Sequence, residues 1–278
     1  GDKLLEAVDE ALLIGRESGS HLHISHHKAA GKANWGKVGQ SLLKVEKALL
    51  SGQAVTLDVY PYTAGSGRMI EYFNLDNPDE ELARTIRIAS CPANKLYEGR
   101  MLVDIAKEEG KTLPEMVRSV LLAPGGDKTL CIQFVISEED VETNIKQKDM
   151  MIGSDGIPDL KGRPHPRLFG TFPRVLGHYV RDKKLIGLAE AIRRMTSLPA
   201  RIFGMKERGR VAEGYHADLV LFDSGLISDQ ATYDQPMLPP VGIKMVVVNG
   251  EIALSEGQAT GVGSGRMLRY RNDSFSPS

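Results

Sequence analysis

The sequence predicts an α/β fold built on a parallel sheet, followed by a small β unit. Three observations support this prediction. Helical and strand-like patterns alternate along the first part of the chain, and the strand-like segments there are short and apolar. From Glu207 onward the sequence pattern changes to short strands separated by turns. Alternating strands and helices are typical of parallel β/α architecture, and closely spaced short strands are typical of antiparallel sheets. The 278 residues suffice for one large domain with an appendage.

The first four predicted elements are a helix, a strand, a second helix and a second strand. Apolar residues recur at helical spacing over 4–12, and glycines at 15 and 19 follow where a helix would end. Residues 22–25 predict a buried strand, and residues 54–60 predict the next one. Asn34 is placed to cap the second helix. The inner face of that helix would carry Val38, Leu42, Val45 and Leu49.

The middle of the chain has weaker patterns. Residues 64–97 are punctuated by Gly, Asn, Asp and Pro, and they predict a long loop or excursion of the kind that is often functional. Ser137 is placed to cap a helix, and residues 150–154 predict another strand, which Asp155 follows directly. Helical patterns occupy the ranges 101–109, 113–122, 137–146, 172–182 and 188–195.

The last part of the chain is dominated by turn residues and short strands. Strand patterns at 219–222, 243–248 and 251–254 are separated by glycine, Asn-Gly and Pro-Pro. Asn249-Gly250 lies between two apolar runs and is a strong signal for a hairpin. The final residues, 272–278, are polar, and we expect them to fray.

Composition excludes several classes of function. The 35 Lys+Arg and 36 Asp+Glu residues give a formal net charge of −1, so the chain lacks the basic excess of a general nucleic-acid binder. Its apolar runs are shorter than the ~18 residues of a membrane helix. Cys91 and Cys131 cannot form a disulfide framework. We therefore expect a cytoplasmic protein without nucleic-acid or membrane partners.

Polar side chains follow three of the predicted strands directly. Residues 22–25 lead into His26, His27 and Lys28, residues 55–59 lead into Tyr60, and residues 152–154 lead into Asp155. The carboxyl ends of the strands of a β/α barrel face the mouth of the active site. These strand ends therefore predict one composite site.

Each of these side chains also has an ordinary structural interpretation. A neutral imidazole such as that of His26 is a good zinc ligand, but a single histidine at a strand end can equally serve as a hydrogen-bonding residue. Asp155 can bind a metal or act as a general base, or it can cap a turn with Gly156. Lys28 and Arg167 can hold a substrate carboxylate, or they can be solvated surface charges.

Longer strings resemble a known family more specifically than spacing alone does. The chain resembles the amidohydrolase superfamily, and within it the D-aminoacylase branch, the N-acyl-D-amino-acid deacylases. The strings that carry the resemblance run in order along the chain: ISHHK at 24–28, DVYPYTAGS at 58–66, IGSDG at 152–156, HPRLFGTFPRVLG at 165–177, MTSLPA at 195–200 and RGRVAEGYHADLV at 208–220.

The resemblance implies a role for individual residues. His26 would be a zinc ligand at the end of the sixth barrel strand, and Asp155 would be the catalytic carboxylate and a metal ligand at the end of the eighth. The resemblance also implies that His165 and Arg174 are supporting residues. The substrate's carboxylate and polar groups would be held by Lys28, Tyr60, Ser66 and Arg167.

The resemblance also implies a domain layout. Residues 1–206 would form the C-terminal part of a TIM-like (β/α)8 barrel, residues 207–270 a small β-sandwich portion, and residues 271–278 a flexible tail. The family's first-strand His-x-His pair, bridging cysteine and fifth-strand histidine have no counterparts here. Because the chain also begins at Gly1 without Met, we expect it to be the later part of a longer protein. We expect the isolated chain to self-associate unless the earlier half of the barrel is present.

The expected reaction is hydrolysis of N-acyl-D-amino acids, small-molecule substrates, by a zinc-activated water, with Asp155 accepting and returning the proton. Two alternatives remain. One is a cyclic amidase of the hydantoinase or dihydroorotase kind, which shares the barrel and the metal chemistry. The other is an inactive fragment or pseudoenzyme that lacks the N-terminal metal ligands.

Overall fold

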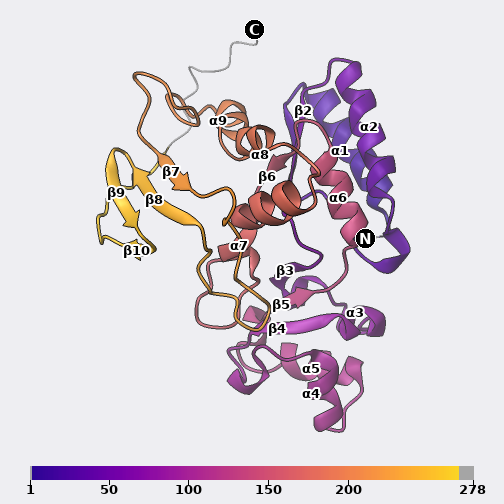
Figure 1. The fold of residues 1–278 in the computed structure, drawn as a ribbon. Coiled ribbons are helices and arrows are strands. Elements are labelled where there is room, and N and C mark those ends of the chain that lie inside the picture. Colours follow the sequence, from indigo (N-terminus) through magenta and orange to yellow (C-terminus); the bar gives the residue numbers. More distant parts are fainter. Residues whose placement is uncertain (1, 269–278) are drawn as a thin grey trace.

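The computed structural model describes residues 2–268 and confirms the α/β class (Figure 1). The first sheet is parallel, with strand order β1-β2-β6. Leu22 of β1 pairs with Val55 of β2, and Asp58 of β2 pairs with Met151 of β6. Its strands are β1 (Leu22–Ile24), β2 (Val55–Val59) and β6 (Met151–Ile152). The predicted alternation of helices with parallel strands is therefore confirmed.

One face of this sheet packs against helices, and the other face is polar. Val55, Leu57 and Val59 of β2 are buried in the same core cluster as side chains of the helices. Burying each such side chain contributes about 1.5–3 kcal/mol. Thr56 and Asp58 alternate with them on the opposite face and are only half buried. The helices that share this core are α1 (Leu4–Ser18), α2 (Val38–Leu50), α6 (Glu138–Lys146) and α8 (Leu188–Met195).

Local sequence signals explain several helix ends. Gly19 takes a left-handed φ of 64° and ends α1, as the pattern predicts. The Ser137 side chain accepts a hydrogen bond from the Asp140 amide at the start of α6, which confirms the predicted cap. Thr112 and Glu115 form a reciprocal capping box at the start of α5 (Leu113–Leu121).

Two details of the early elements differ from the prediction. Asn34 does not cap α2, because it lies in a 3-10 turn (Lys32–Asn34) and its side-chain oxygen accepts a hydrogen bond from Lys37. Leu49 is 45% exposed rather than part of the inner face of α2. β1 is half buried rather than fully buried, and β2 is its only partner strand among residues 2–268.

Of the predicted long loop or excursion at 64–97, the loop is wrong: this stretch belongs to an excursion, a compact lobe (residues 65–133) with its own hydrophobic core. The lobe has a three-stranded antiparallel sheet of order β3-β5-β4. Its core includes Ile88, Leu102, Met116 and Val117. Its elements are β3 (Gly65–Arg68), α3 (Glu80–Arg84), β4 (Ile86–Ser90), α4 (Leu102–Glu108), α5 and β5 (Leu130–Gln133), with 3-10 turns at Met69–Glu71, Lys95–Tyr97 and Gly126–Lys128. In Figure 1 the lobe lies below the parallel sheet.

A long helical segment follows the parallel sheet. It begins as α7 (Arg167–Arg174) and continues directly as a π-helix (Val175–Asp182), so it starts earlier than the predicted 172–182. Pro173 lies inside it and cannot donate a backbone hydrogen bond. A further helix, α9 (Ser197–Ile202), was not predicted and follows α8 closely.

The last described residues form a four-stranded antiparallel sheet of order β10-β9-β8-β7. Its strands are β7 (Leu219–Phe222), β8 (Ile243–Val248), β9 (Glu251–Ser255) and β10 (Gln258–Ala259). Asn249 and Gly250 both have positive φ, 48° and 87°, as the predicted hairpin turn requires. The 271–278 tail lies outside the described residues.

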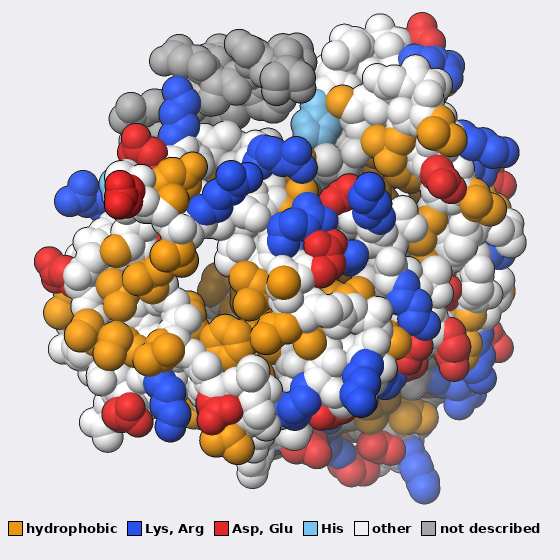
Figure 2. Space-filling model, turned by 45° about the horizontal axis from the view of Figure 1, so that its top comes forward, with side chains coloured by type: hydrophobic (Ala, Val, Ile, Leu, Met, Phe, Trp, Pro, Cys, Tyr) orange, Lys and Arg blue, Asp and Glu red, His pale blue; other side chains and the backbone are white. Residues whose placement is uncertain are grey.

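Apolar side chains of this sheet are exposed. Val220 and Leu221 are 55% and 60% exposed, although they alternate in direction along β7. Figure 2 shows hydrophobic side chains gathered on the left part of the molecule, where this sheet lies. Separately, no helix among residues 2–268 is both long and apolar enough to cross a membrane.

Candidate active site

The polar face of the parallel sheet carries a continuous hydrogen-bond network. The Thr56 hydroxyl lies 2.9 Å from His21 Nε2 and 2.8 Å from His23 Nδ1. His23 Nε2 lies 2.8 Å from Asp58 Oδ2. The other Asp58 oxygen accepts a 2.7 Å bond from the His26 backbone N–H. Hydrogen bonds to both oxygens hold the pKa of Asp58 below its usual value, although burial opposes this shift.

The backbone of His26, just after the end of β1, is therefore held in a fixed conformation. Its φ of 44° lies in the left-handed region, and the bond from its backbone N–H to Asp58 holds it there. Its ring Nδ1 lies 2.8 Å from the ammonium of Lys28. Nε2 has no hydrogen-bond partner among the described residues and belongs to an exposed side chain. His26 thus presents one free ring nitrogen at the strand end.

Asp155 forms an ion pair with a fully buried arginine. Asp155 Oδ2 lies 2.9 Å from Arg167 Nη2. The Asp155 side chain is 39% exposed, whereas that of Arg167 is 1% exposed. Asp155 also has a left-handed φ of 47°. It does not follow the strand directly as predicted, because β6 ends at Ile152 and Gly153 and Ser154 lie between. The carboxylate is thus open to solvent on one side and paired with a buried charge on the other.

Arg167 has N–H donors without a hydrogen-bond partner among the described residues. Besides its bond to Asp155, Nη2 donates to the backbone carbonyl of Ser66 at 3.2 Å. Nε and Nη1 are buried and have no hydrogen-bond partner among the described residues. An unsatisfied buried donor costs about 1–3 kcal/mol. This arrangement is suited to receiving an anion, because a carboxylate can accept two parallel bonds from a guanidinium.

Tyr60 and Lys28 complete this cluster. The Arg167 guanidinium lies 4.5 Å from the centre of the Tyr60 ring, and Lys28 Nζ lies 5.4 Å from it. Tyr60 is buried, and its hydroxyl has no hydrogen-bond partner within the described part of the chain. Burial lowers the pKa of Lys28 to about 8; the Asp155 carboxylate acts in the opposite direction, and the Arg167 charge adds to the lowering. Two cations thus flank one aromatic ring beside Asp155.

His165 supports Arg167 from behind. Its Nε2 lies 3.0 Å from the Ala64 carbonyl, and its Nδ1 accepts the Arg167 backbone N–H at 3.0 Å. This pattern requires a neutral ring protonated at Nε2. Burial and the Arg167 charge hold the pKa of His165 well below its usual value. Arg174 lies further away, with Nε bonded to the Pro61 carbonyl at 2.9 Å and Nη1 3.3 Å from Asp229.

The structure thus brings most of the predicted site residues together. Asp155, Arg167, Tyr60 and Lys28 form one cluster, and Lys28 connects it to His26. Ser66 joins through its backbone carbonyl, which shows that β3 of the lobe reaches the site.

The metal site is incomplete within the described residues. Residues 2–268 contain no group of three or more His, Cys, Asp or Glu side chains arranged to hold a metal ion. His26 and Asp155 are suitable ligand types, but zinc sites use three or four protein ligands. The described residues alone therefore do not fit a zinc ion.

Sequence reasoning missed the contribution of Asp58. It lies within a strand whose neighbours Leu57 and Val59 are buried, and it joins β1 to the site through His23 and His26. A carboxylate inside an otherwise apolar strand is the signal that indicates such a role, because an unpaired charge there would be costly.

Comparisons with known proteins agree with this geometry. The family model described as "Amidohydrolase family" matches residues 116–254. A D-aminoacylase of Alcaligenes xylosoxydans xylosoxydans is 41% identical over 96% of this chain and 52% of its own length. An N-acyl-D-glutamate deacylase of the same organism is 40% identical over 90% of this chain and 49% of its own. The chain thus spans about half the length of the curated relatives it matches.

A solved structure gives the same result. The N-acyl-D-glutamate deacylase of Bordetella bronchiseptica, complexed with zinc and a phosphonate inhibitor, has a TM-score of 0.83 and 38% identity over 93% of this chain and 52% of that chain. The fold is of the α/β class, and the chain belongs to the amidohydrolase family. Its similarity lies in the D-aminoacylase branch of that family.

Proposed function

We propose that the protein carrying this chain hydrolyses the amide bond of N-acyl-D-amino acids, and that this chain supplies the residues that anchor the substrate and transfer the proton. The observation that carries the proposal is the buried Arg167, whose two unpartnered N–H donors lie beside Lys28, Tyr60 and Asp155. The names of the relatives that match over 90% or more of the chain support the same substrate class.

The anchoring step follows from charge and burial. The α-carboxylate of the substrate would accept hydrogen bonds from Arg167 and would be attracted by the positive charge of Lys28. Tyr60 and Ser66 would bind the other polar groups of the substrate. A charge pair formed in a site with little water is stronger than one at the surface. This anchoring would fix which face of the substrate is presented to Asp155 and so favour one enantiomer.

Asp155 would hold the proton. Its carboxylate is 39% exposed, so a water molecule can approach it. It would accept a proton from the attacking water and deliver it to the leaving amine. When the substrate carboxylate binds Arg167, it would share the guanidinium with Asp155.

We propose zinc as the metal, because a structure of a similar deacylase contains it. His26 Nε2 and Asp155 would contribute ligands, and the remaining ligands would come from outside the described residues. Such an ion supplies a hydroxide at neutral pH by lowering the pKa of its bound water to about 7.

The proposed layout keeps the partial barrel at 1–206 and the β-sandwich portion at 207–270. The three parallel strands support the first assignment, since β1 and β6 each have one edge without a partner strand among residues 2–268. The apolar side chains exposed on β7 support the second, because a second sheet or another protein surface would cover them. The earlier half of the barrel, or self-association, would supply these partners.

The buried free thiols at Cys91 and Cys131 support a reducing compartment, which we propose is the cytoplasm.

One experiment tests the substrate class. The complete protein, loaded with zinc, is offered N-acetyl-D-amino acids, their L-enantiomers, and the matching carboxamides that lack the free carboxylate. We expect release of free amine only from the D-acids. Hydrolysis of a hydantoin ring without hydrolysis of the linear acids would favour the cyclic amidase. Failure to hydrolyse any amide would favour the inactive form.

A further inference from the structure

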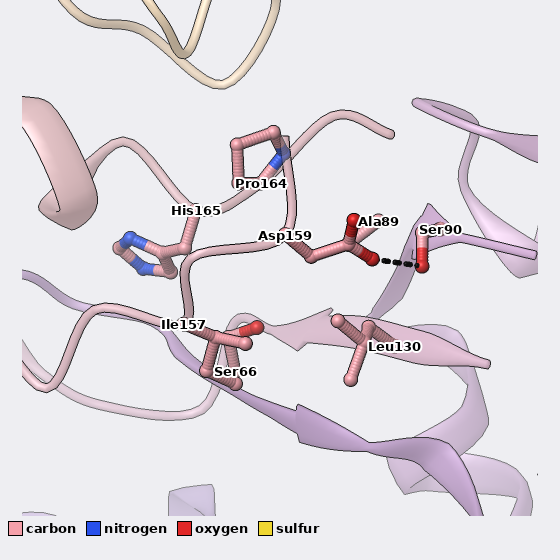
Figure 3. A pocket seen from close by; sticks show the side chains of 8 residues that line it. All are labelled: Ser66, Ala89, Ser90, Leu130, Ile157, Asp159, Pro164 and His165. Atoms are coloured by element: carbon pink, nitrogen blue, oxygen red, sulfur yellow. Dashed lines mark hydrogen bonds between the residues drawn. The ribbon is translucent and has the colours of Figure 1, made fainter. Parts of the chain in front are cut away.

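Asp155 and Arg167 lie at the two ends of an irregular stretch of chain between β6 and α7. Residues 156–164, called here the connecting segment, contain no helix or strand. Because a flexible connection would let Asp155 and Arg167 move independently, the placement of both groups depends on what holds this segment. The segment lies on the lobe, against β4 and β5 (Figure 3).

Backbone and side-chain bonds attach the segment to β4. The Arg163 backbone N–H donates to the Ala89 carbonyl at 2.7 Å. The Ser90 hydroxyl donates to Asp159 Oδ2 at 2.9 Å, the bond drawn in Figure 3. Ser90 is buried and Asp159 is half-buried, so this bond is partly shielded from solvent. The other Asp159 oxygen accepts the Lys161 N–H at 3.1 Å and shapes the turn.

An irregularity in β4 makes the first bond possible. Ile88 pairs with Cys131 and Ser90 with Leu130, so Ala89 is an extra residue in the ladder with β5. A bulge leaves its extra residue unpaired and changes the direction of its groups. The carbonyl of Ala89 is thus available to Arg163, and bulges of this kind are frequent next to active sites.

Gly162 is the point of closest approach. A Cβ added there would lie 2.6 Å from Ser90 Cβ and 3.0 Å from Ser90 Cα, and closer still to the Ala89 carbonyl oxygen. Two of these three atoms belong to the backbone, so no side-chain rotation relieves the clash. The segment reaches β4 only because residue 162 is glycine.

The C-terminal unit adds a second attachment. Arg163 Nη1 donates to the Asp234 carbonyl at 3.2 Å, and the Asp234 carboxylate pairs with Arg87 of β4 at 2.6 Å. In Figure 1 the connection between β7 and β8 runs down to the lobe, where these contacts lie. Beyond the segment, His165 binds both the Ala64 carbonyl and the Arg167 N–H. A chain of hydrogen bonds and one ion pair therefore extends from β4 to Arg167.

We infer that the β4 bulge and the 234 region hold the connecting segment so that Asp155 and Arg167 are positioned together, and that Ser90, Asp159 and Gly162 are positioning residues for the reaction. The inference rests on the proposed function, in which both ends of the segment act on one substrate. A cavity of about 10 Å³ between Ser66, Ser90, Asp159 and His165 shows how closely the segment fits the lobe. A misplacement of about 1 Å from a distant change can lower a rate about 100-fold.

Two measurements on the complete, zinc-loaded protein test this inference. The first is the rate of tryptic cleavage after Lys161, an exposed residue in the segment, relative to cleavage after the exposed Lys206 outside it. The second is the separation of kcat from KM for an N-acetyl-D-amino acid. Ser90→Ala and Asp159→Ala each remove the same hydrogen bond, so we expect both to raise cleavage after Lys161. We also expect both to lower kcat by about tenfold, and the double variant to be no worse than Asp159→Ala, which also removes the bond from the Lys161 N–H.

Gly162→Ala and Gly39→Ala form a matched pair for the steric argument. A Cβ at Gly39 has no neighbour within 4 Å, so this variant should keep the kcat of the parent protein. Gly162→Ala should lower kcat by about tenfold or more, because the backbone near Ala89 has to shift to admit the added Cβ. Zinc content and melting temperature identify variants that merely fail to fold.

The outcomes separate this inference from the proposed function. Raised cleavage after Lys161 with unchanged kcat would overturn the positioning role, since the segment would then be held without effect on the reaction. Unchanged cleavage in Ser90→Ala would overturn it as well, because the bond would not hold the segment. A parent protein without deacylase activity contradicts the proposed function, and the cleavage rates alone then decide whether the lobe holds the segment.

Discussion

Replacing Arg167 with methionine should separate stability from activity. The side chain is fully buried, and methionine has a similar unbranched shape that can fill the space. In most proteins, the loss of a buried arginine that pairs with a carboxylate destabilises the fold, because the partner charge stays buried. Here the partner, Asp155, is 39% exposed and keeps its hydration.

The magnitude follows from the contacts of Arg167. The variant loses an ion pair to a part-exposed carboxylate, worth about 1 kcal/mol. It also loses a hydrogen bond to the Ser66 carbonyl, worth about 1 kcal/mol, and a contact with the Tyr60 ring of about 1 kcal/mol. It gains relief of two unpartnered buried donors, Nε and Nη1, at about 1–3 kcal/mol each. The net change in the free energy of unfolding should lie between about −1 and +3 kcal/mol.

Activity should change far more than stability. Truncating one partner of a buried charge pair with a ligand costs about 2–5 kcal/mol, which is about 30-fold to several thousand-fold in kcat/KM. Arg167→Lys is the matched control, because it keeps the charge and loses the two-pronged fork. The assay combines urea unfolding with kcat/KM for an N-acetyl-D-amino acid. A loss of more than 3 kcal/mol of stability with unchanged kcat/KM would contradict substrate binding by Arg167, because Arg167 would then be a structural residue.

Three further predictions concern pH, zinc binding and association. The folded chain holds His165 neutral with a pKa well below 6.5, and the unfolded chain binds the extra proton. The free energy of unfolding should therefore be fully retained above pH 6.5 and fall as the pH drops below it, by up to about 1.4 kcal/mol per pH unit from this group. His165→Gln should flatten this slope in urea unfolding between pH 5 and 7, and an identical slope would contradict the assignment. Asp58→Ala should weaken zinc binding by the complete protein about 10–100-fold in chelator competition, because the His26 backbone N–H loses its acceptor. Unchanged affinity would show that Asp58 does not orient the ligand. The chain of residues 1–278 alone should self-associate in sedimentation experiments. Leu221→Lys should reduce this association, because Leu221 is an exposed apolar side chain of β7. A monomer at every concentration would count against β7 as an association surface.

Local signals predicted most elements of the fold. Gly19, Ser137 and Asn249-Gly250 were sufficient for a helix end, a cap and a hairpin, because each depends on a few neighbouring residues. The lobe at 65–133 was mostly missed. Its strands β3 and β4 pair with β5 more than forty residues later, and such pairing leaves no short-range pattern in the sequence.

The candidate site likewise has a part that the sequence predicts and a part that it does not. Strand ends identified His26, Lys28, Tyr60 and Asp155, because the geometry of parallel sheets dictates where those residues lie. The burial of Arg167 and the free donors it leaves depend on Ser66 and Asp155, which are distant in sequence. The attachment of the connecting segment to Ala89 depends on a bulge, and the sequence contains no signal for it.

We propose that Asp155, held beside the carboxylate-binding Arg167, transfers the proton in amide hydrolysis. The most direct test measures hydrolysis of an N-acetyl-D-amino acid by the complete, zinc-loaded protein and its Asp155→Asn variant. Asparagine keeps the size and one acceptor oxygen for Arg167, so the fold and substrate binding should persist. We predict that the variant binds the D-acid and loses turnover by about 100-fold or more. Turnover equal to that of the parent protein would contradict a proton-transfer role for Asp155.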